Sequence, residues 1–136
     1  MDQERKEQLI ERILNRTKTI AVVGLSSKRS RAGYYVPAYL QRQGYRIIPV
    51  NPYLHDALGE KAYAELVDVP HDVDLVLLFR RSDAVPPFVT QAIEIGADAV
   101  WMQAGIINHG AAEQARAAGL DVVMDTCMMV EHRRRQ

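Results

Sequence analysis

The stretch from Thr19 to Pro52, TIAVVGLSSKRSRAGYYVPAYLQRQGYRIIPVNP, decides the fold. It opens with a short run of β-branched and apolar residues, 19–23, which is typical of a strand buried on both faces. Apolar residues at helical spacing then predict a helix over 33–43, and a second strand-like run follows at 46–50. A strand, a helix and another strand in this order predict two parallel strands joined by a right-handed crossover.

The same alternation continues beyond this unit. Three more apolar runs lie at 74–79, 98–102 and 121–124, and segments of helical periodicity lie at 62–66, 84–95 and 111–118. Strands that alternate with helices predict an α/β fold, here a doubly wound parallel five-stranded sheet with helices on both faces. We expect the strand order 3-2-1-4-5, in which the order reverses between the first and the fourth strand.

The N-terminal segment, 2–16, is predicted to be an amphipathic helix that packs against this sheet. Its apolar residues recur at helical spacing among charges: Leu9, Ile10, Ile13 and Leu14. The chain has 136 residues and contains no linker-like or low-complexity tract. We therefore expect a single domain, 1–136, made of this helix and a core over 17–135.

Composition limits the possible partners. The chain is 48% hydrophobic and 25% charged, and its 17 basic and 17 acidic residues balance, so no overall field attracts nucleic acid or an anionic membrane. The densest apolar run, 75–79, is too short to cross a bilayer, and the N-terminus lacks a secretory signal. Cys127 is the only cysteine, which excludes an internal disulfide and a thiolate zinc cluster. We expect a cytoplasmic protein without a metal.

The loop after the first strand contains the groups that bind anions. Residues 24–31 combine a glycine, hydroxyls and cations: Gly24, Ser26, Ser27, Lys28, Arg29 and Arg31. Backbone N–H groups near a helix start add to this inventory. A solvated loop whose serines cap the next helix is the alternative. A second group of cations, Arg80 and Arg81, follows the third strand. Together the two loops suggest a ligand with several phosphates. The alternative is that Arg80 and Arg81 are a solvated surface pair.

Two common nucleotide motifs are excluded or disfavoured. A dinucleotide fingerprint requires glycines where Ser26 and Arg29 stand, and an acidic residue at the end of the second strand where the chain has Asn51 and Pro52. NAD is therefore disfavoured. The phosphate loop of nucleoside triphosphatases, G-x-x-x-x-G-K-[ST], does not occur.

No catalytic constellation is recognisable. The four histidines are scattered, and none has the spacing of a nucleophile and its base; they are His55, His71, His109 and His132. Cys127 follows the last strand and is expected to be a small packed hydrophobe, with a thiol that reaches the ligand as the alternative. The closing segment, 131–135, is expected to be a solvated tail.

Several ordered motifs together resemble a known family. They are IAVVGLSSKRSRAGYYVPAYLQRQGYRIIPVNP (20–52), VDLVLLFRRSDAVPPFV (73–89), AVWMQAGIIN (99–108) and AGLDVVMDTCMMVEHRR (118–134). Over about 17–135 the chain is similar to the stand-alone CoA-binding domain family, which is related to the CoA-binding domain of the succinyl-CoA synthetase alpha subunit and of NDP-forming acyl-CoA synthetases. The resemblance implies a Rossmann-like fold that holds coenzyme A across the strand ends.

The resemblance also implies a role for each motif. The loop Gly24-Leu25-Ser26-Ser27, with Lys28 and Arg29 beside it, would hold the pyrophosphate, and Asn51 and Pro52 would shape the neighbouring wall. Phe79, Arg80 and Arg81 would border the adenosine and its phosphate. Gln103 and Gly105 would lie nearer the pantetheine. Thr126 stands where the family usually has an arginine, so any role of that arginine is not carried over.

These implications lead to an expected function. The synthetases need a phosphohistidine domain and a nucleotide-binding domain, which 136 residues do not hold. We therefore expect a non-catalytic protein that binds CoA or an acyl-CoA and no nucleic acid or membrane, with a homo-oligomer or a separate ligase subunit as a possible assembly. The alternative is an enzyme or enzyme subunit, either the CoA-handling part of an acyl-CoA ligase or an atypical NAD(P)-linked oxidoreductase.

Overall fold

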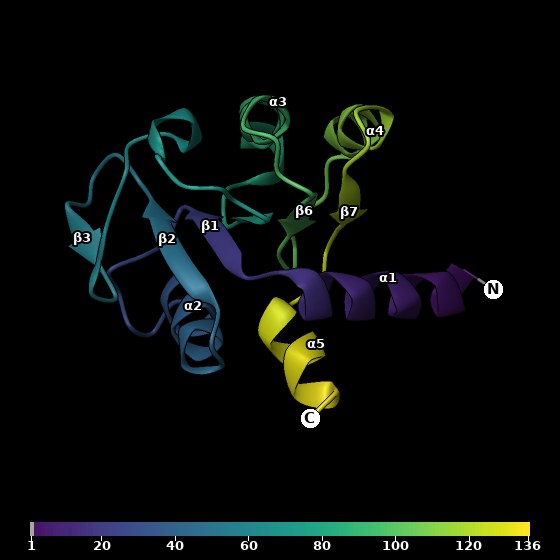
Figure 1. The fold of residues 1–136 in the computed structure, drawn as a ribbon, viewed down its shortest axis with the longest axis horizontal. Helices are drawn as coiled ribbons and strands as arrows, with labels where there is room; N and C mark the ends of the chain where they lie inside the picture. Colours follow the sequence, from purple (N-terminus) through teal and green to yellow (C-terminus); the bar gives the residue numbers. More distant parts are fainter. Residues whose placement is uncertain (1) are drawn as a thin grey trace.

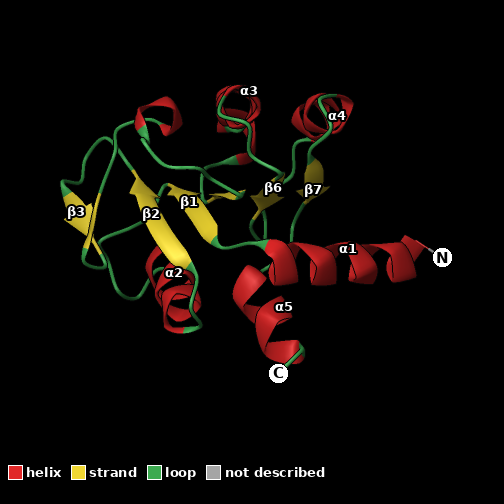
Figure 2. Ribbon diagram, viewed as in Figure 1, coloured by secondary structure: helices red, strands yellow, loops and turns green. Residues whose placement is uncertain are grey.

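A parallel five-stranded sheet forms the centre of the computed structural model, which describes residues 2–136. The strands are β1 (Thr19–Val23), β2 (Arg46–Val50), β5 (Leu75–Leu78), β6 (Ala99–Met102) and β7 (Asp121–Val123). Their order across the sheet is β2-β1-β5-β6-β7, and every neighbouring pair is parallel (Figures 1 and 2). The predicted Rossmann-like α/β class and all five predicted strands are confirmed.

The expected strand order is wrong. Counted along the chain, the five strands have the order 2-1-3-4-5 instead of 3-2-1-4-5. Both orders use parallel strands with right-handed crossovers, so periodicity and handedness do not distinguish them. The segment 51–74 first packs beside α2 (Ala32–Arg42) through Leu54, Ala57 and Leu58, then crosses to the opposite face at Leu66 and Val73 and carries the chain past β1 to β5. The order therefore reverses between β1 and β5, and the site is expected there.

The same segment explains a second error. The helix predicted over 62–66 does not form, because Tyr63 lies beside the end of β2: its N–H donates to the Pro49 carbonyl, and its carbonyl accepts from Asn51 N–H. The segment instead contains a small antiparallel hairpin and one turn of 3₁₀ helix; these are β3 (Asp56–Ala57), β4 (Glu60–Lys61) and η1 (Leu66–Asp68).

Helices cover both faces of the sheet. One face carries α1 (Asp2–Arg16), α2 and α5 (Met128–Arg134), and the other carries η1, α3 (Pro86–Glu94) and α4 (His109–Ala117), with the short η2 (Ser82–Ala84) before α3. The sheet separates two hydrophobic cores. In β1, Ile20 and Val22 face the first layer whereas Ala21 and Val23 face the second, so the strand is apolar from residue 20 to its end.

Helix α1 confirms the amphipathic prediction. Ile10, Ile13 and Leu14 are buried against the first layer. Arg16 donates to Asp121, at the start of β7, over 2.7 Å, and Arg12 donates to the same carboxylate over 3.1 Å. The apolar stripe and these ion pairs fix the helix across the edge of the sheet. No helix of residues 2–136 is long and apolar enough to span a membrane.

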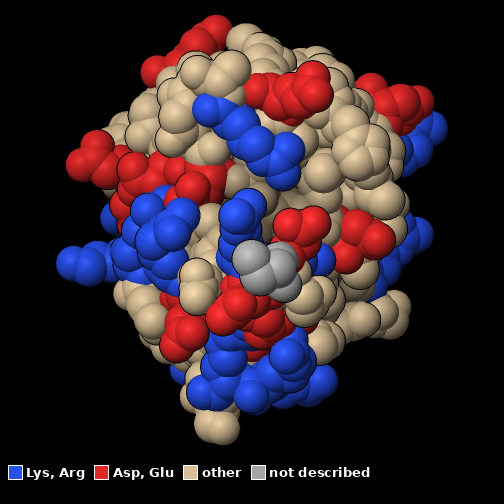
Figure 3. Space-filling view, turned by 90° about the vertical axis from the view of Figure 1, so that its right-hand side faces the viewer, with Lys and Arg blue, Asp and Glu red and all other residues tan. Residues whose placement is uncertain are grey.

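The predicted solvated tail is wrong, because the chain ends in helix α5. The side chain of Gln103 accepts a hydrogen bond from Met128 N–H over 3.0 Å, and Met128 is fully buried. Arg135 then donates to Glu7 over 2.6 Å and to Glu131 over 3.0 Å. Basic residues that suggested a tail instead tie α5 to α1. On the face seen in Figure 3, groups of basic side chains lie beside acidic ones.

Candidate functional site

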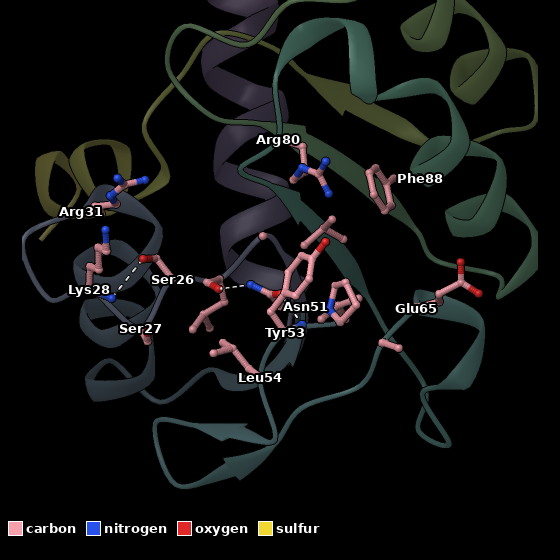
Figure 4. A pocket seen from close by; sticks show the side chains of 16 residues that line it. Ser26, Ser27, Lys28, Arg31, Asn51, Tyr53, Leu54, Glu65, Arg80 and Phe88 are labelled. Atoms are coloured by element: carbon pink, nitrogen blue, oxygen red, sulfur yellow. Dashed lines mark hydrogen bonds between the residues drawn. The ribbon is translucent and has the colours of Figure 1, made fainter.

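A large cleft lies at the carboxyl ends of the strands, where the strand order reverses. It has a volume of about 830 Å³, within the range usual for small-molecule sites. Its lining residues come from the loops after β1, β2 and β5, from the segment before η1 and from α3: Val23, Gly24, Leu25, Ser26, Ser27, Lys28, Arg31, Val50, Asn51, Pro52, Tyr53, Leu54, Ala64, Glu65, Arg80 and Phe88 (Figure 4). The cleft therefore joins the two loops that the sequence singled out.

Gly24 turns the chain at the end of β1. Its φ of +85° lies in the left-handed region that favours glycine. A Cβ atom at this position would lie 3.1 Å from the carbonyl oxygen of Phe79 and 3.1 Å from Cδ of Arg80. Glycine is therefore required for the backbone conformation and for the close approach of the loops after β1 and β5.

Helix α2 holds this loop from the other side. Pro37 lies inside α2 and has no N–H, so the carbonyl of Gly33, four residues earlier, lacks its usual intrahelical donor. The N–H of Ser26 donates to that carbonyl over 3.0 Å. A Cβ atom at Gly33 would lie 3.2 Å from the carbonyl oxygen of Gly24, so the missing side chain lets the helix and the loop approach. Together the proline and the glycine fix the loop against the helix.

The loop presents polar groups at the start of α2. Ser26 Oγ accepts from Lys28 N–H over 3.0 Å. The expected alternative of a serine cap is wrong, because Arg31 is the N-cap residue and, within residues 2–136, its side chain makes no capping hydrogen bond. The positive end of the α2 dipole thus adjoins the cleft beside Lys28 and Arg31, an arrangement that suits an anion.

Asn51 connects two walls of the cleft. Its side-chain Nδ2 donates to the carbonyl of Leu25 over 2.9 Å, and its Oδ1 accepts from Tyr53 N–H over 2.9 Å (Figure 4). The side chain of Leu25 is fully buried, so this residue contributes backbone to the cleft. Asn51 therefore has a structural part in shaping the cleft, in addition to any contact with a ligand.

Eight of the predicted site residues line the cleft, and five do not. Those in the cleft are Gly24, Leu25, Ser26, Ser27, Lys28, Asn51, Pro52 and Arg80; those outside are Arg29, Phe79, Arg81, Gln103 and Gly105. The guanidinium of Arg29 lies over the Tyr34 ring at 6.0 Å, and Arg81, with its side chain 84% exposed, pairs with Asp83 at 3.4 Å. Phe79 is half-buried and packs against the first-layer core.

Gln103 directly follows β6 and Gly105 lies in the loop after it, away from the reversal between β1 and β5. Gln103 is buried and bonded to Met128, and Gly105 donates its N–H to Asp125 Oδ1 over 2.7 Å. The resemblance implied that they lie nearer the pantetheine, and this role stays a prediction. Their contacts in the structure hold the start of α5 and the loop before α4.

Arg31, which the sequence placed among the cations of the first loop, lines the cleft, but several other lining residues were missed. Tyr53 directly follows Asn51-Pro52 and could have been noticed. Glu65 and Phe88 come from segments that only the chain path brings to the cleft. The Arg80 guanidinium lies over the Phe88 ring at 5.5 Å. This cation–π contact joins two elements, so no local sequence pattern predicts it.

Groups with shifted pKa values lie elsewhere. Burial lowers the pKa of His132, and burial, with the neighbouring Tyr39, raises the pKa of Tyr45; both residues lie where α5 meets α1 and α2. Among residues 2–136, no group of three or more His, Cys, Asp or Glu side chains is placed to hold a metal ion. Cys127 is half-buried, precedes α5 and packs against the first-layer core, outside the cleft lining.

The sheet and its cleft define an α/β domain of the Rossmann-like class, with a loop rich in cations and hydroxyls at the switch point. The chain belongs to the CoA binding domain family, whose sequence profile matches residues 18–133. The resemblance drawn from the motifs is thereby confirmed. No ligand contact is shown by this membership, so the roles of individual residues stay predictions.

Similar proteins fall into two groups. The chain is 41% identical over 123 residues to YneT of Bacillus subtilis, covering 90% of this chain and 91% of YneT. A hypothetical protein from Pyrococcus horikoshii has the same fold, with 41% identity, a TM-score of 0.91 and coverage of 94% and 90% of the two chains. The ADP-forming acetate–CoA ligase of Methanocaldococcus jannaschii is 29% identical over 94 residues, which cover 68% of this chain but only 13% of the ligase.

Proposed function

We propose that the protein binds coenzyme A or an acyl-CoA in the cleft at the ends of β1, β2 and β5. The observation that carries this proposal is the loop after β1, held so that Ser26, Lys28 and Arg31 border the cleft at the open start of α2. Such a loop accepts a pyrophosphate, and the close packing at Gly24 leaves no room for a side chain that would cover it. Membership in the CoA binding domain family supports the choice of ligand.

The proposed role is binding without catalysis. Of the described residues that line the cleft, Glu65 is the only one with a carboxylate, and none is a histidine or cysteine. The described lining holds no pair of carboxylates and no nucleophile paired with a histidine base, the arrangements that acid–base and nucleophilic catalysis most often use. The lining therefore supports a binding protein. We also expect it to work in the cytoplasm, where the Cys127 thiol would stay reduced.

The alternative is a part in a larger enzyme. The similarity to 13% of an ADP-forming acetate–CoA ligase supports the idea that this chain could present CoA to a partner that supplies the remaining domains. An NAD(P)-linked oxidoreductase has weaker support, because Asn51 stands where a ribose-binding carboxylate is usual.

An equilibrium binding panel tests the proposal. Isothermal calorimetry with CoA, acetyl-CoA, NAD, NADP and ADP should show CoA or acetyl-CoA as the tightest ligand. Tighter binding of NAD or NADP would favour the oxidoreductase, and no binding of either CoA compound would refute the proposal. Formation of acetyl-CoA from CoA, acetate and ATP by the protein alone would refute the non-catalytic role.

A further inference from the structure

Tyr53 is an aromatic ring held in the open at the mouth of the cleft. Its exposed fraction is 91%, the highest among the large hydrophobic side chains exposed in the described chain. The backbone beneath it is fixed, because Pro52 precedes it and its N–H donates to Asn51 Oδ1 over 2.9 Å. Asn51 is itself bonded to Leu25 in the loop after β1. The turn therefore positions the ring relative to the anion-binding loop.

A second flat surface belongs to the same cleft. Arg80, from the loop after β5, lies over the Phe88 ring at 5.5 Å, and both residues line the cleft with Tyr53. Figure 4 shows the Tyr53 hydroxyl directed to the side of the view where Arg80 lies. The planar guanidinium can pack one face on Phe88 and offer the other to a ligand. The cleft thus presents an aromatic ring and an arginine plane from separate elements.

This pair of surfaces has the chemistry that binds a nucleobase. Purine rings stack on aromatic side chains and on arginine planes, and every base offers a flat face. A tyrosine that is 91% exposed in the free protein loses little internal contact when a base covers it. The phosphate-binding loop lies in the same cleft, so a nucleotide could contact both regions at once.

We infer that Tyr53 stacks on the purine base of the ligand and, with the Arg80–Phe88 pair, restricts the site to nucleotide-bearing ligands. The inference rests on the proposed function, since CoA carries an adenosine 3′,5′-bisphosphate. It assigns the base-binding contact to a residue outside the predicted site. Tyr53 is thus a specificity-determining residue with no part in any reaction.

Calorimetry with two ligands tests the inference. CoA and adenosine 3′,5′-bisphosphate share the base, and only CoA has the pantetheine arm. Tyr53→Leu should weaken both by the same factor, about 5- to 100-fold, as expected for loss of one base-stacking contact. Tyr53→Phe keeps the ring and should bind like the wild type. Tyr35→Leu is the matched control, because Tyr35 is a tyrosine with 44% exposure on α2, outside the cleft lining.

The outcomes separate this inference from the proposed function. Equal melting temperatures would show that all variants fold, as the exposure of Tyr53 leads us to expect. Unchanged affinity of Tyr53→Leu for CoA would overturn the inference and leave the proposed function standing. A loss of affinity for CoA alone would place Tyr53 against the pantetheine arm and would also overturn the inference. A wild-type protein that binds neither compound would overturn both.

Discussion

At Gly24, the backbone conformation and the close contact with a neighbouring loop each require glycine. The backbone is left-handed, and a Cβ atom would press against the carbonyl of Phe79, which cannot rotate away as a side chain could. Gly44 is a matched control, because its φ is +102° but a Cβ atom there meets nothing within 4 Å in the described chain. Each alanine substitution should cost about 1 kcal/mol or more for the backbone.

We predict that Gly24→Ala lowers the free energy of unfolding more than Gly44→Ala and also weakens CoA binding. Urea denaturation and calorimetry on both variants measure the two effects. Equal loss of stability in the two variants, with binding intact, would contradict the close-approach argument. The close contact with the Phe79 backbone is the reason for the expected cost in stability.

Arg80 and Arg81 are adjacent but have different environments. From the sequence, both were expected to contact phosphate. The structure places Arg80 in the cleft, while Arg81 extends into solvent and pairs with Asp83 at 3.4 Å. We predict that Arg80→Ala weakens CoA binding by roughly 1–3 kcal/mol, as loss of a charge-assisted contact does, and that Arg81→Ala has little effect. A larger effect from Arg81→Ala in calorimetry would show that this loop moves when ligand binds.

Cys127 is half-buried and lies outside the cleft lining. It packs against the first-layer core at the start of α5, and β6 and β5 separate the end of β7 from the reversal at β1. We predict that the native protein incubated with oxidised CoA keeps an unmodified intact mass. In denaturant the same thiol should form a single CoA-sized adduct, which is absent in Cys127→Ser and shows that the assay works. An adduct on the native wild type would bring the thiol within reach of the ligand.

Among the elements, α5 was the least predictable. Each central strand is a local apolar run, so position along the chain was enough to find it. Helix α5 has only seven residues, and it depends on Gln103 to accept the Met128 N–H and on Glu7 to pair with Arg135. These partners are far apart in sequence. A local reading of its charges therefore suggests solvent exposure.

His132 gives α5 a pH dependence. Its Nδ1 lies 2.7 Å from the Tyr39 hydroxyl, and burial lowers its pKa from 6.5. Below pH 6.5 the unfolded chain takes up a proton more readily than the folded one, so the free energy of unfolding should fall as the pH drops through this value toward the lowered one. Urea denaturation between about pH 7.5 and 5.5 measures the fall. In His132→Asn the free energy of unfolding should fall less over the same pH range. A pH profile identical to that of the wild type would rule out His132 as the source of the fall.

At the scale of the whole molecule, the strand order decides which residues meet. The loops after β1 and β5 face each other only because β5 lies beside β1, and this places Arg80 near Gly24 and leaves Gln103 outside the cleft. Local sequence patterns predict the loops, but they do not predict the path of segment 51–74. For that reason the anion-binding loop was predictable, whereas Phe88 and Glu65 were not.

The final prediction concerns ligand binding and global stability. The chain has no formal net charge, so attraction of an anionic ligand depends on the local cations Lys28, Arg31 and Arg80. CoA at about 100 times its Kd should stabilise the fold by about 2.7 kcal/mol, which for a domain of this size raises the melting temperature by roughly 5–10 °C. Differential scanning calorimetry measures this shift.

Salt separates the charged contribution from the rest. At a fixed CoA concentration the shift should shrink as ionic strength rises from about 0.1 M to 1 M, because the screening length falls from about 10 Å to about 3 Å. Replacing Lys28 and Arg31 with glutamine should reduce both the shift and its dependence on salt, and Arg42→Gln, a basic residue of α2 outside the cleft, is the control. A shift that salt leaves unchanged would mean that the ligand is held mainly by apolar and stacking contacts, and the cations of the loop would then have no part in holding its phosphates.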